Sequence, residues 1–122
     1  MVILVVDDNP EMRRMIRNVV GDLGDVYECS EGEGAVADYN RYQPDWVLMD
    51  IRLGAVNGIQ ATARITAADP DARIVIVTNY DDVELRHACA RAGACDYVLK
   101  ENLSEVRRIL VRALDQPKNR TC

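Results

Sequence analysis

Residues 2–8 read Val2-Ile3-Leu4-Val5-Val6-Asp7-Asp8, and this stretch decides how the fold is interpreted. Consecutive apolar residues that are mostly β-branched are typical of a strand covered on both faces. Similar runs occur at residues 46–49 and 74–77. Such strands belong to mostly parallel sheets with helices on either side. The stretch therefore predicts an α/β domain whose first strand ends in two acidic residues.

Strand and helix patterns alternate five times along residues 1–115. The strands are short and the connections take only a few residues, which is typical of βα units. The predicted strands are Val2 to Val6, Val26 to Cys29, Trp46 to Met49, Arg73 to Val77 and Asp96 to Leu99. The predicted helices run from Pro10 to about Leu23, Gly34 to Arg41, Gly58 to Ala68, Asp81 to Ala92 and Asn102 to Asp115.

The first and last helices are predicted to be amphipathic, because their apolar residues recur every three or four positions. Proline at the first helical position favours the start of the first helix. The predicted apolar stripes consist of Met12, Met15, Ile16, Val19, Val20 and Leu23 in the first helix, and of Leu103, Val106, Ile109, Leu110, Ala113 and Leu114 in the last. The outer face of the last helix is predicted to carry Arg107, Arg108 and Arg112.

This alternation predicts a single doubly wound (βα)5 domain of the flavodoxin-like class. Right-handed crossovers restrict the parallel sheet to a few strand orders, and we expect 2-1-3-4-5 because it is the commonest order for five strands. With 122 residues, of which 48% are hydrophobic, the chain has room for one sizeable core. We expect residues 1–115 to form this domain and residues 116–122 to form a C-terminal tail or the start of a linker.

The charge and the apolar pattern limit the function classes. The formal net charge of −5 argues against direct binding to nucleic acid or to anionic lipid, since both surfaces are negative. No apolar run approaches the ~20 residues that cross a bilayer, and no secretory signal is recognisable. The cysteines form no C-x-x-C pair, so neither a zinc knuckle nor a thioredoxin-like site is indicated. We expect a cytoplasmic protein.

Chemically active residues follow four of the predicted strands: Asp7 and Asp8, then Asp50, Thr78 and Lys100. Because the carboxyl ends of parallel strands share one edge, we expect these side chains to converge. Three neighbouring carboxylates repel one another, and a hard divalent cation removes that conflict. Mg²⁺ prefers oxygen ligands and combines carboxylates with phosphate oxygens, so it is the expected cofactor.

A carboxylate at this edge can also be phosphorylated. An aspartate attacks phosphorus to form an aspartyl phosphate when nearby groups neutralise the transferred charge. The ammonium group of Lys100 can pair with one phosphate oxygen, and the hydroxyl of Thr78 can donate a hydrogen bond to another. These residue types are therefore compatible with an aspartyl phosphate at this edge of the sheet.

With these residues, the sequence resembles the receiver domain of two-component response regulators over about residues 1–115. Gly58 and the stretch Ala92 to Tyr97 before Lys100 fit the same pattern. The resemblance implies that Asp50 accepts the phosphoryl group, that Asp7, Asp8, Asp50 and the backbone carbonyl of Arg52 hold Mg²⁺, that Thr78 and Lys100 bind the phosphate, and that Thr78 and Tyr97 form a switch pair.

The resemblance also implies partners. A sensor histidine kinase or phosphotransfer protein would donate the phosphoryl group. An output domain or downstream protein would bind the face formed by the fourth helix, the fifth strand and the fifth helix, and phosphorylation would promote a homodimer. The chain would catalyse only its own phosphorylation and dephosphorylation, so it would not be a stand-alone enzyme.

Three positions depart from the family pattern. Glu101 follows Lys100 where the family usually has a cis proline, and because a cis non-proline bond costs ~2.5–4 kcal/mol we predict a trans bond. Gly54 replaces a common proline, which predicts a looser loop after Asp50. Asn79 follows Thr78 where a small residue is usual. The residues Arg52 and Tyr80 occupy positions that tune phosphoryl lifetime in the family.

Other interpretations of the sequence remain open. Asp7 and Asp8 precede a helix, where acidic residues are favourable without any binding role. Residues 32–37 match G-x-G-x-x-A, but Glu31 and Glu33 would repel a pyrophosphate, which disfavours a dinucleotide site. A receiver-like scaffold could dock its partner without phosphorylation. A Mg²⁺-dependent phosphatase of the haloacid-dehalogenase type usually has D-x-D after its first strand, whereas Asn9 is not acidic here.

Overall fold

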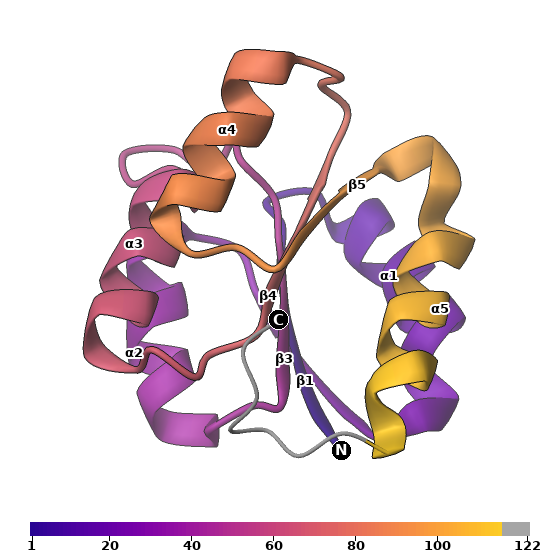
Figure 1. Cartoon of the computed structure of the whole chain (residues 1–122). Coiled ribbons are helices and arrows are strands. Elements are labelled where there is room, and N and C mark those ends of the chain that lie inside the picture. Colours follow the sequence, from indigo (N-terminus) through magenta and orange to yellow (C-terminus); the bar gives the residue numbers. More distant parts are fainter. Residues whose placement is uncertain (116–122) are drawn as a thin grey trace.

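The computed structural model describes residues 1–115, which form a five-stranded sheet flanked by helices on both faces (Figure 1). Every neighbouring pair of strands is parallel, and the strand order is β2-β1-β3-β4-β5. The predicted fold class and strand order are confirmed. The strands are β1 (Val2–Val6), β2 (Asp25–Cys29), β3 (Trp46–Met49), β4 (Ile74–Thr78) and β5 (Asp96–Leu99).

The helices form two layers. One layer packs α1 and α5 against one face of the sheet, and the other packs α2, α3 and α4 against the opposite face (Figure 1). The α-helices are α1 (Pro10–Val20), α2 (Gly32–Tyr42), α3 (Gly58–Ala68), α4 (Val83–Ala92) and α5 (Leu103–Arg112). Short 3₁₀ turns are η1 (Gly21–Leu23), η2 (Lys100–Asn102) and η3 (Ala113–Asp115).

The three inner strands β1, β3 and β4 form the centre of the core. Almost all of their residues are fully buried, as the continuous apolar runs predicted. Alternate side chains point to opposite faces: Leu4 and Val6 pack toward α2, α3 and α4, whereas Ile3 and Val5 pack toward α1 and α5. Burial of this apolar surface on both faces is the main force that holds the strand ends in place.

Side chains at the helix starts explain where three helices begin. Asn9 accepts hydrogen bonds from the backbone of Glu11 and Met12 at the start of α1, directly before Pro10. Asn57 forms a capping box with Gln60 at the start of α3. The side chain of Asp82 accepts a hydrogen bond from the backbone of Leu85 at 3.1 Å. The fourth helix therefore starts at Val83, two residues later than predicted.

Several predicted boundaries and two predicted core residues are wrong. The first and last helices each end in a 3₁₀ turn, and α2 begins at Gly32 rather than Gly34. Met15 is 49% exposed and Leu114 is 55% exposed, although both were assigned to apolar stripes. Each lies at the margin of its stripe, where the neighbouring layer no longer covers it. The predicted tail, residues 116–122, lies outside the described residues.

In residues 1–115 no helix is long and apolar enough to span a membrane.

Gly58 allows the start of α3 to approach the end of β3 closely. Its backbone N–H donates to the carbonyl of Ile51 at 2.7 Å. A Cβ atom at this position would lie 1.8 Å from the backbone oxygen of Asp50. Only glycine fits here without moving the backbone that carries Asp50.

Substituting Gly58→Ala should lower the free energy of unfolding by on the order of 3 kcal/mol, since the new methyl group meets backbone rather than a movable side chain. The measurement is urea denaturation followed by circular dichroism. Gly21→Ala is the matched control, because its Cβ would meet only the Arg17 side chain at 3.7 Å and its φ of −65° suits alanine. Equal stability of the two variants would contradict this account of Gly58.

Candidate functional site

Three carboxylates converge at the carboxyl edge of the sheet. Asp7 and Asp8 follow β1, and Asp50 follows its neighbour β3. Each of the three offers one carboxylate oxygen, and these oxygens lie within 4.8 Å of one another. Asp7 is 1% exposed and Asp50 is 6% exposed, whereas Asp8 is open to solvent. The site thus combines two buried acids with one accessible acid.

Backbone hydrogen bonds hold the two buried acids in place. The N–H of Asp7 donates to the carbonyl of Cys29 at 3.0 Å, and the N–H of Asp50 donates to the carbonyl of Val6 at 2.9 Å. One carboxylate oxygen of each acid also accepts a backbone N–H, from Asn9 at 2.9 Å and from Ile51 at 2.8 Å. The sheet ladder therefore continues into the site and fixes both side chains.

Lys100 brings a positive charge to these acids from the end of β5, which is an edge strand of the sheet. Its Nζ lies 3.0 Å from Asp7 Oδ2 and 3.2 Å from Asp50 Oδ2, and its side chain is only 9% exposed. The residue begins η2 directly after β5. Its peptide bond to Glu101 is trans, as predicted. The structure thus brings together Asp7, Asp8, Asp50 and Lys100.

The charge balance of the site is reflected in two shifted pKa values. Burial raises the pKa of Asp50 above its ordinary value, the nearby charge of Asp7 raises it further, and Lys100 offsets only part of this effect. Burial alone would lower the pKa of Lys100, but the carboxylates of Asp7 and Asp50 outweigh it and raise that pKa. Lys100 is therefore charged, and the acids are left with excess negative charge.

The donor set fits a hard divalent cation. Asp7 Oδ2 is buried, and the Lys100 ammonium lies 3.0 Å from it. The single ammonium of Lys100 does not balance the buried carboxylates of both Asp7 and Asp50, so a further cation would stabilise them. Oxygen atoms from three carboxylates suit Mg²⁺, whereas thiolate and imidazole ligands would indicate other metals. The cluster can hold Mg²⁺ through Asp7, Asp8 and Asp50.

Thr78 and Tyr97 are linked through the backbone of Tyr80. Thr78 is fully buried at the end of β4, and its Oγ1 accepts the N–H of Tyr80 at 3.4 Å. The hydroxyl of Tyr97 donates to the carbonyl of Tyr80. Arg86 lies over the Tyr97 ring, 4.4 Å from its centroid. The predicted switch residues therefore contact the same short segment after β4.

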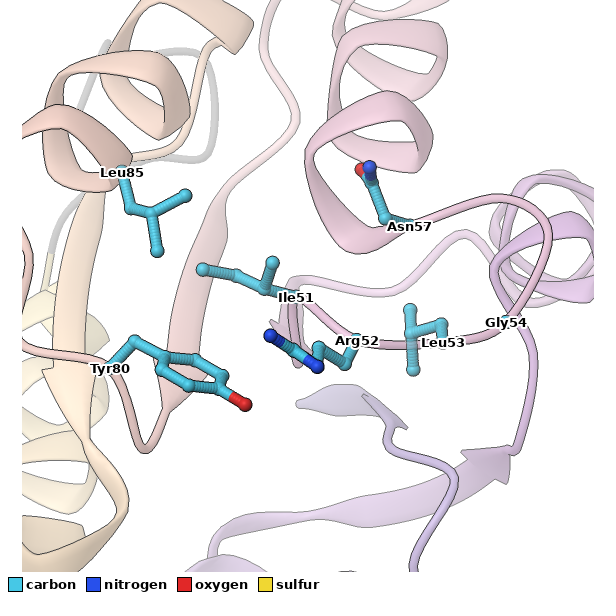
Figure 2. Close-up of a pocket in the computed structure, with 7 residues that line it drawn as sticks. All are labelled: Ile51, Arg52, Leu53, Gly54, Asn57, Tyr80 and Leu85. Atoms are coloured by element: carbon cyan, nitrogen blue, oxygen red, sulfur yellow. The ribbon is translucent and has the colours of Figure 1, made fainter.

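A hollow of about 390 Å³ lies between the segments that follow β3 and β4, and its lining begins at Ile51, the residue after Asp50 (Figure 2). The guanidinium of Arg52 lies over the ring of Tyr80, 4.8 Å from its centroid. Gly54 has φ of +90°, a conformation that favours glycine over the proline expected from the family. The hollow is lined by Ile51, Arg52, Leu53, Gly54, Asn57, Tyr80 and Leu85.

The glycine-rich segment at residues 32–37 offers no dinucleotide site. It lies within α2, and a Cβ on Gly32 would meet the carbonyl oxygen of Val56 at 2.0 Å. The backbone of the β3–α3 connection thus covers the helix start where a pyrophosphate would have to bind. This packing supports the rejection of a dinucleotide site.

The sequence did not reveal three residues that organise the site: Asn9, Ile51 and Arg13. Asn9 and Ile51 act through backbone N–H groups, which carry no sequence signature. Arg13 donates through Nη1 to the carbonyl of Asp7 at 2.6 Å. Its position in α1 resembled any other solvent-facing arginine, so no motif pointed to this contact.

Comparison with known families agrees with this geometry. The model of the family "Response regulator receiver domain" matches residues 3–112. The chain belongs to this family. Receiver domains of this family are signalling modules rather than classical enzymes.

Curated relatives place the receiver domain in two kinds of protein. The chain is 34% identical over 100 residues to the chemotaxis protein CheY of Listeria monocytogenes, covering 80% of the chain and 84% of CheY. It is 35% identical over 114 residues to the regulatory protein AtoC of Escherichia coli, covering 92% of the chain but 25% of AtoC. The chain thus spans a quarter of AtoC and about half, 52%, of the Bacillus subtilis regulator YxjL.

Solved structures give the same result. A two-component response regulator of the LuxR family from Aurantimonas sp. SI85-9A1 superposes with a TM-score of 0.84 at 30% identity, covering 93% of the chain and 84% of that structure. The BeF3 activated DrrB receiver domain gives a TM-score of 0.86 at 26% identity, covering 94% of the chain and 97% of that structure.

Asp50→Asn should raise the Tm of the receiver domain by a few degrees at neutral pH when divalent cations are removed. Because the pKa of Asp50 is raised on folding, the folded state loses stability as pH rises from the ordinary pKa of about 3.9 through the folded pKa. The gain in the variant should therefore vanish in acid. Differential scanning calorimetry at several pH values in EDTA measures this.

The control for this measurement is Asp25→Asn, which neutralises an exposed acid at the start of β2. Its Tm should follow that of the unsubstituted domain at every pH. A lower Tm for Asp50→Asn at neutral pH would show that the negative charge of Asp50 stabilises the fold.

Proposed function

We propose that this receiver domain accepts a phosphoryl group on Asp50 in a Mg²⁺-dependent reaction and thereby changes a partner-binding surface. The observation that carries the proposal is the position of Lys100, whose Nζ lies 3.0 Å from Asp7 and 3.2 Å from Asp50. One ammonium group is thereby placed beside both the proposed nucleophile and a proposed metal ligand. Such an arrangement neutralises charge on a phosphoryl group during its transfer.

In the proposed reaction a carboxylate oxygen of Asp50 attacks the phosphorus of the donor. The new O–P bond forms as the bond from phosphorus to the leaving atom breaks, and that electron pair departs with the donor. The donor is the phosphorylated imidazole of a sensor histidine kinase or phosphotransfer protein, or a small acyl phosphate. Mg²⁺, when held by Asp7, Asp8, Asp50 and the proposed carbonyl of Arg52, supplies positive charge to the phosphoryl oxygens.

Asp50 is suited to be the nucleophile because it is both fixed and reachable. Its N–H and one carboxylate oxygen are held by backbone hydrogen bonds to Val6 and Ile51. It is nevertheless 6% exposed and directly precedes Ile51, which lines a hollow, whereas Asp7 is 1% exposed. Lys100 occupies the side of Asp50 nearest to Asp7 and would pair with the phosphoryl oxygens after transfer.

Thr78 would bind another phosphoryl oxygen and transmit the change. Its oxygen accepts the Tyr80 N–H at 3.4 Å, which leaves its own hydroxyl hydrogen available as a donor. Movement of Thr78 toward the phosphoryl group would lengthen this already weak bond and shift Tyr80. The carbonyl of Tyr80 accepts the Tyr97 hydroxyl, so the shift would reach Tyr97 on β5.

The output of the switch is proposed to be the face formed by α4, β5 and α5. An output domain or downstream protein would bind this face, and phosphorylation would promote homodimers in the cytoplasm. Reversal of a two-state equilibrium from about 1:99 to 99:1 requires about 5.5 kcal/mol of differential stabilisation. AtoC and YxjL are regulatory proteins longer than this chain, which supports an output domain as one class of partner.

Incubation with Mg²⁺ and acetyl phosphate should add the mass of one phosphoryl group to the chain, and peptide mapping should place it on Asp50. Asp50→Asn should abolish the modification because an amide cannot attack phosphorus. Asp25→Asn should leave it unchanged. Beryllofluoride should protect Asp50 from modification, since DrrB is described as BeF3 activated.

Three outcomes separate the candidate functions in this experiment. A modification on Asp50 that requires Mg²⁺ supports the receiver proposal. A folded chain that remains unmodified would instead support a scaffold that docks without phosphorylation. Turnover of phosphate esters without a stable adduct would support a Mg²⁺-dependent phosphatase.

Tyr80→Ala should shorten the lifetime of the phosphorylated form several-fold. The variant removes the ring on which Arg52 lies and widens the hollow lined by Ile51, the residue next to Asp50, so that water can approach the phosphoryl group more easily. It keeps the contacts to Thr78 and Tyr97, because both involve backbone atoms of Tyr80. The loss of ³²P after removal of the donor measures the lifetime.

Tyr27→Ala is the control, because Tyr27 is a similarly exposed tyrosine on β2 at the far edge of the sheet. Its phosphoryl lifetime should match that of the unsubstituted domain. An unchanged or longer lifetime in Tyr80→Ala would show that the ring does not limit access to Asp50.

A further inference from the structure

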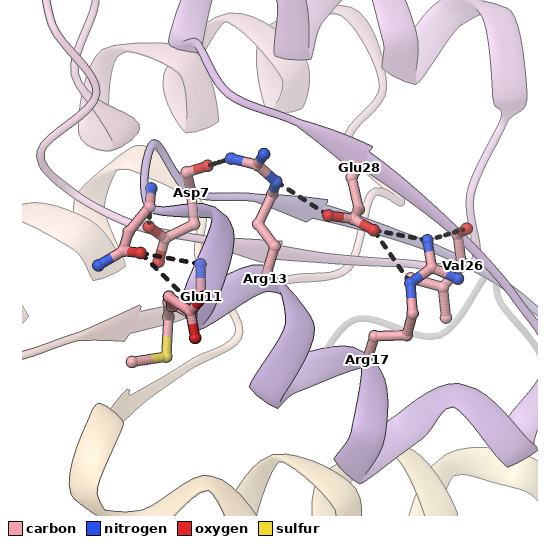
Figure 3. A network of polar contacts seen from close by, with 8 residues as sticks. Asp7, Glu11, Arg13, Arg17, Val26 and Glu28 are labelled. Carbon is pink, nitrogen blue, oxygen red and sulfur yellow. Dashed lines mark hydrogen bonds and ion pairs between the residues drawn. The ribbon is translucent and has the colours of Figure 1, made fainter.

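Arg13 reaches from α1 to the backbone of the acidic segment (Figure 3). Its Nη1 donates to the carbonyl oxygen of Asp7 at 2.6 Å, and its Nε donates to Glu28 Oε1 at 2.9 Å. The side chain is only 18% exposed. Arg13 therefore joins the segment after β1 to Glu28 near the end of β2 through one rigid, planar group.

A second arginine of α1 fixes the other end of this connection. Arg17 donates to Glu28 Oε2 through Nη2 at 2.7 Å and through Nε at 3.0 Å, and it also donates to the carbonyl of Val26 at 3.1 Å (Figure 3). The hydrogen bonds and charge of Arg17 and Arg13 hold the pKa of Glu28 below its usual value. Glu28 thus remains charged and anchors Arg13.

The carbonyl that Arg13 holds belongs to the peptide between Asp7 and Asp8. A peptide unit is planar, so holding its oxygen fixes the direction from which the next residue departs. Asp8 is that next residue, and it is the exposed acid of the cluster. Asp7, in contrast, is separately held through its N–H by Cys29 and through Oδ1 by Asn9.

We infer that Arg13 is a positioning residue for the divalent cation site, acting by orienting the Asp7-Asp8 peptide so that the Asp8 carboxylate faces the other two. The inference rests on the proposed function, because it assumes that this cluster binds Mg²⁺. Groups that orient metal ligands typically contribute 10–100-fold to metal affinity. Arg13 would do so through a backbone carbonyl rather than through a ligand side chain.

The positive charge of Arg13 and its positioning role have opposite effects on Mg²⁺ affinity. The direction in which the affinity changes when Arg13 is replaced therefore distinguishes the two. A guanidinium close to the cluster repels a divalent cation, and its removal should strengthen Mg²⁺ binding if charge were its only influence. Loss of positioning should weaken Mg²⁺ binding. A weaker affinity after removal of a positive charge can therefore not be explained by electrostatic repulsion.

The experiment measures Mg²⁺ binding to the full chain by isothermal titration calorimetry at constant ionic strength, with the Tm of every variant recorded. Arg13→Gln should raise the Mg²⁺ Kd about tenfold. Glu28→Gln, which keeps the charge of Arg13 but weakens its anchor, should raise the Kd by a smaller factor. Arg14→Gln is the matched control. It removes the same charge at the position next to Arg13, where the arginine forms an exposed ion pair with Glu11.

Arg14→Gln should leave the Kd within a factor of about two, or lower it slightly through reduced repulsion. An unchanged or lower Kd in Arg13→Gln would overturn the inference while leaving the proposed function intact. Absence of Mg²⁺ binding by the unsubstituted chain would instead refute the proposed metal site itself. If Arg13→Gln fails to fold, Glu28→Gln decides, and an unchanged Kd in that folded variant overturns the inference.

Discussion

Like charges forced together at the carboxyl edge of the sheet are the constraint on which the rest of this molecule depends. Asp7 and Asp50 are almost fully buried directly after the neighbouring strands β1 and β3, and Asp8 adds a third carboxylate within the same cluster. The ion pairs described for Asp7 and Asp50 both come from Lys100. One ammonium does not balance three carboxylates, so the site is poised to take up further positive charge.

The core stabilises this unfavourable cluster. The inner strands β1, β3 and β4 are buried on both faces, and their hydrogen bonds continue into Asp7 and Asp50. The acids cannot separate without breaking the sheet, so their repulsion is retained as a local conflict within an otherwise well-packed domain. Conflicts of this kind are expected at functional sites, where local stability is given up for binding or chemistry. Gly58 belongs to the same arrangement, since only glycine lets α3 begin against the backbone of Asp50.

Backbone atoms carry much of the connection between the site and its surroundings. Tyr80 contacts Thr78 through its N–H and Tyr97 through its carbonyl, while its ring supports Arg52. Arg13 likewise reaches the acidic segment through the Asp7 carbonyl. These contacts join the segment after β4 and the start of α1 to the residues around the acidic cluster. Neither connection depends on a side chain that touches Asp50.

The amino-acid sequence alone determined the fold class, the strand order and the convergence of Asp7, Asp8, Asp50 and Lys100, because apolar periodicity and position after a strand are local properties that the parallel sheet translates directly into space. The sequence pattern wrongly predicted that Met15 and Leu114 are buried, whereas both side chains are exposed. Only the tertiary structure decided which helix margins are covered, that Thr78 and Tyr97 share Tyr80, and that Arg13 holds Asp7. These contacts join residues through backbone oxygens and N–H groups, which all residue types except proline possess, so the sequence carries almost no signal for them.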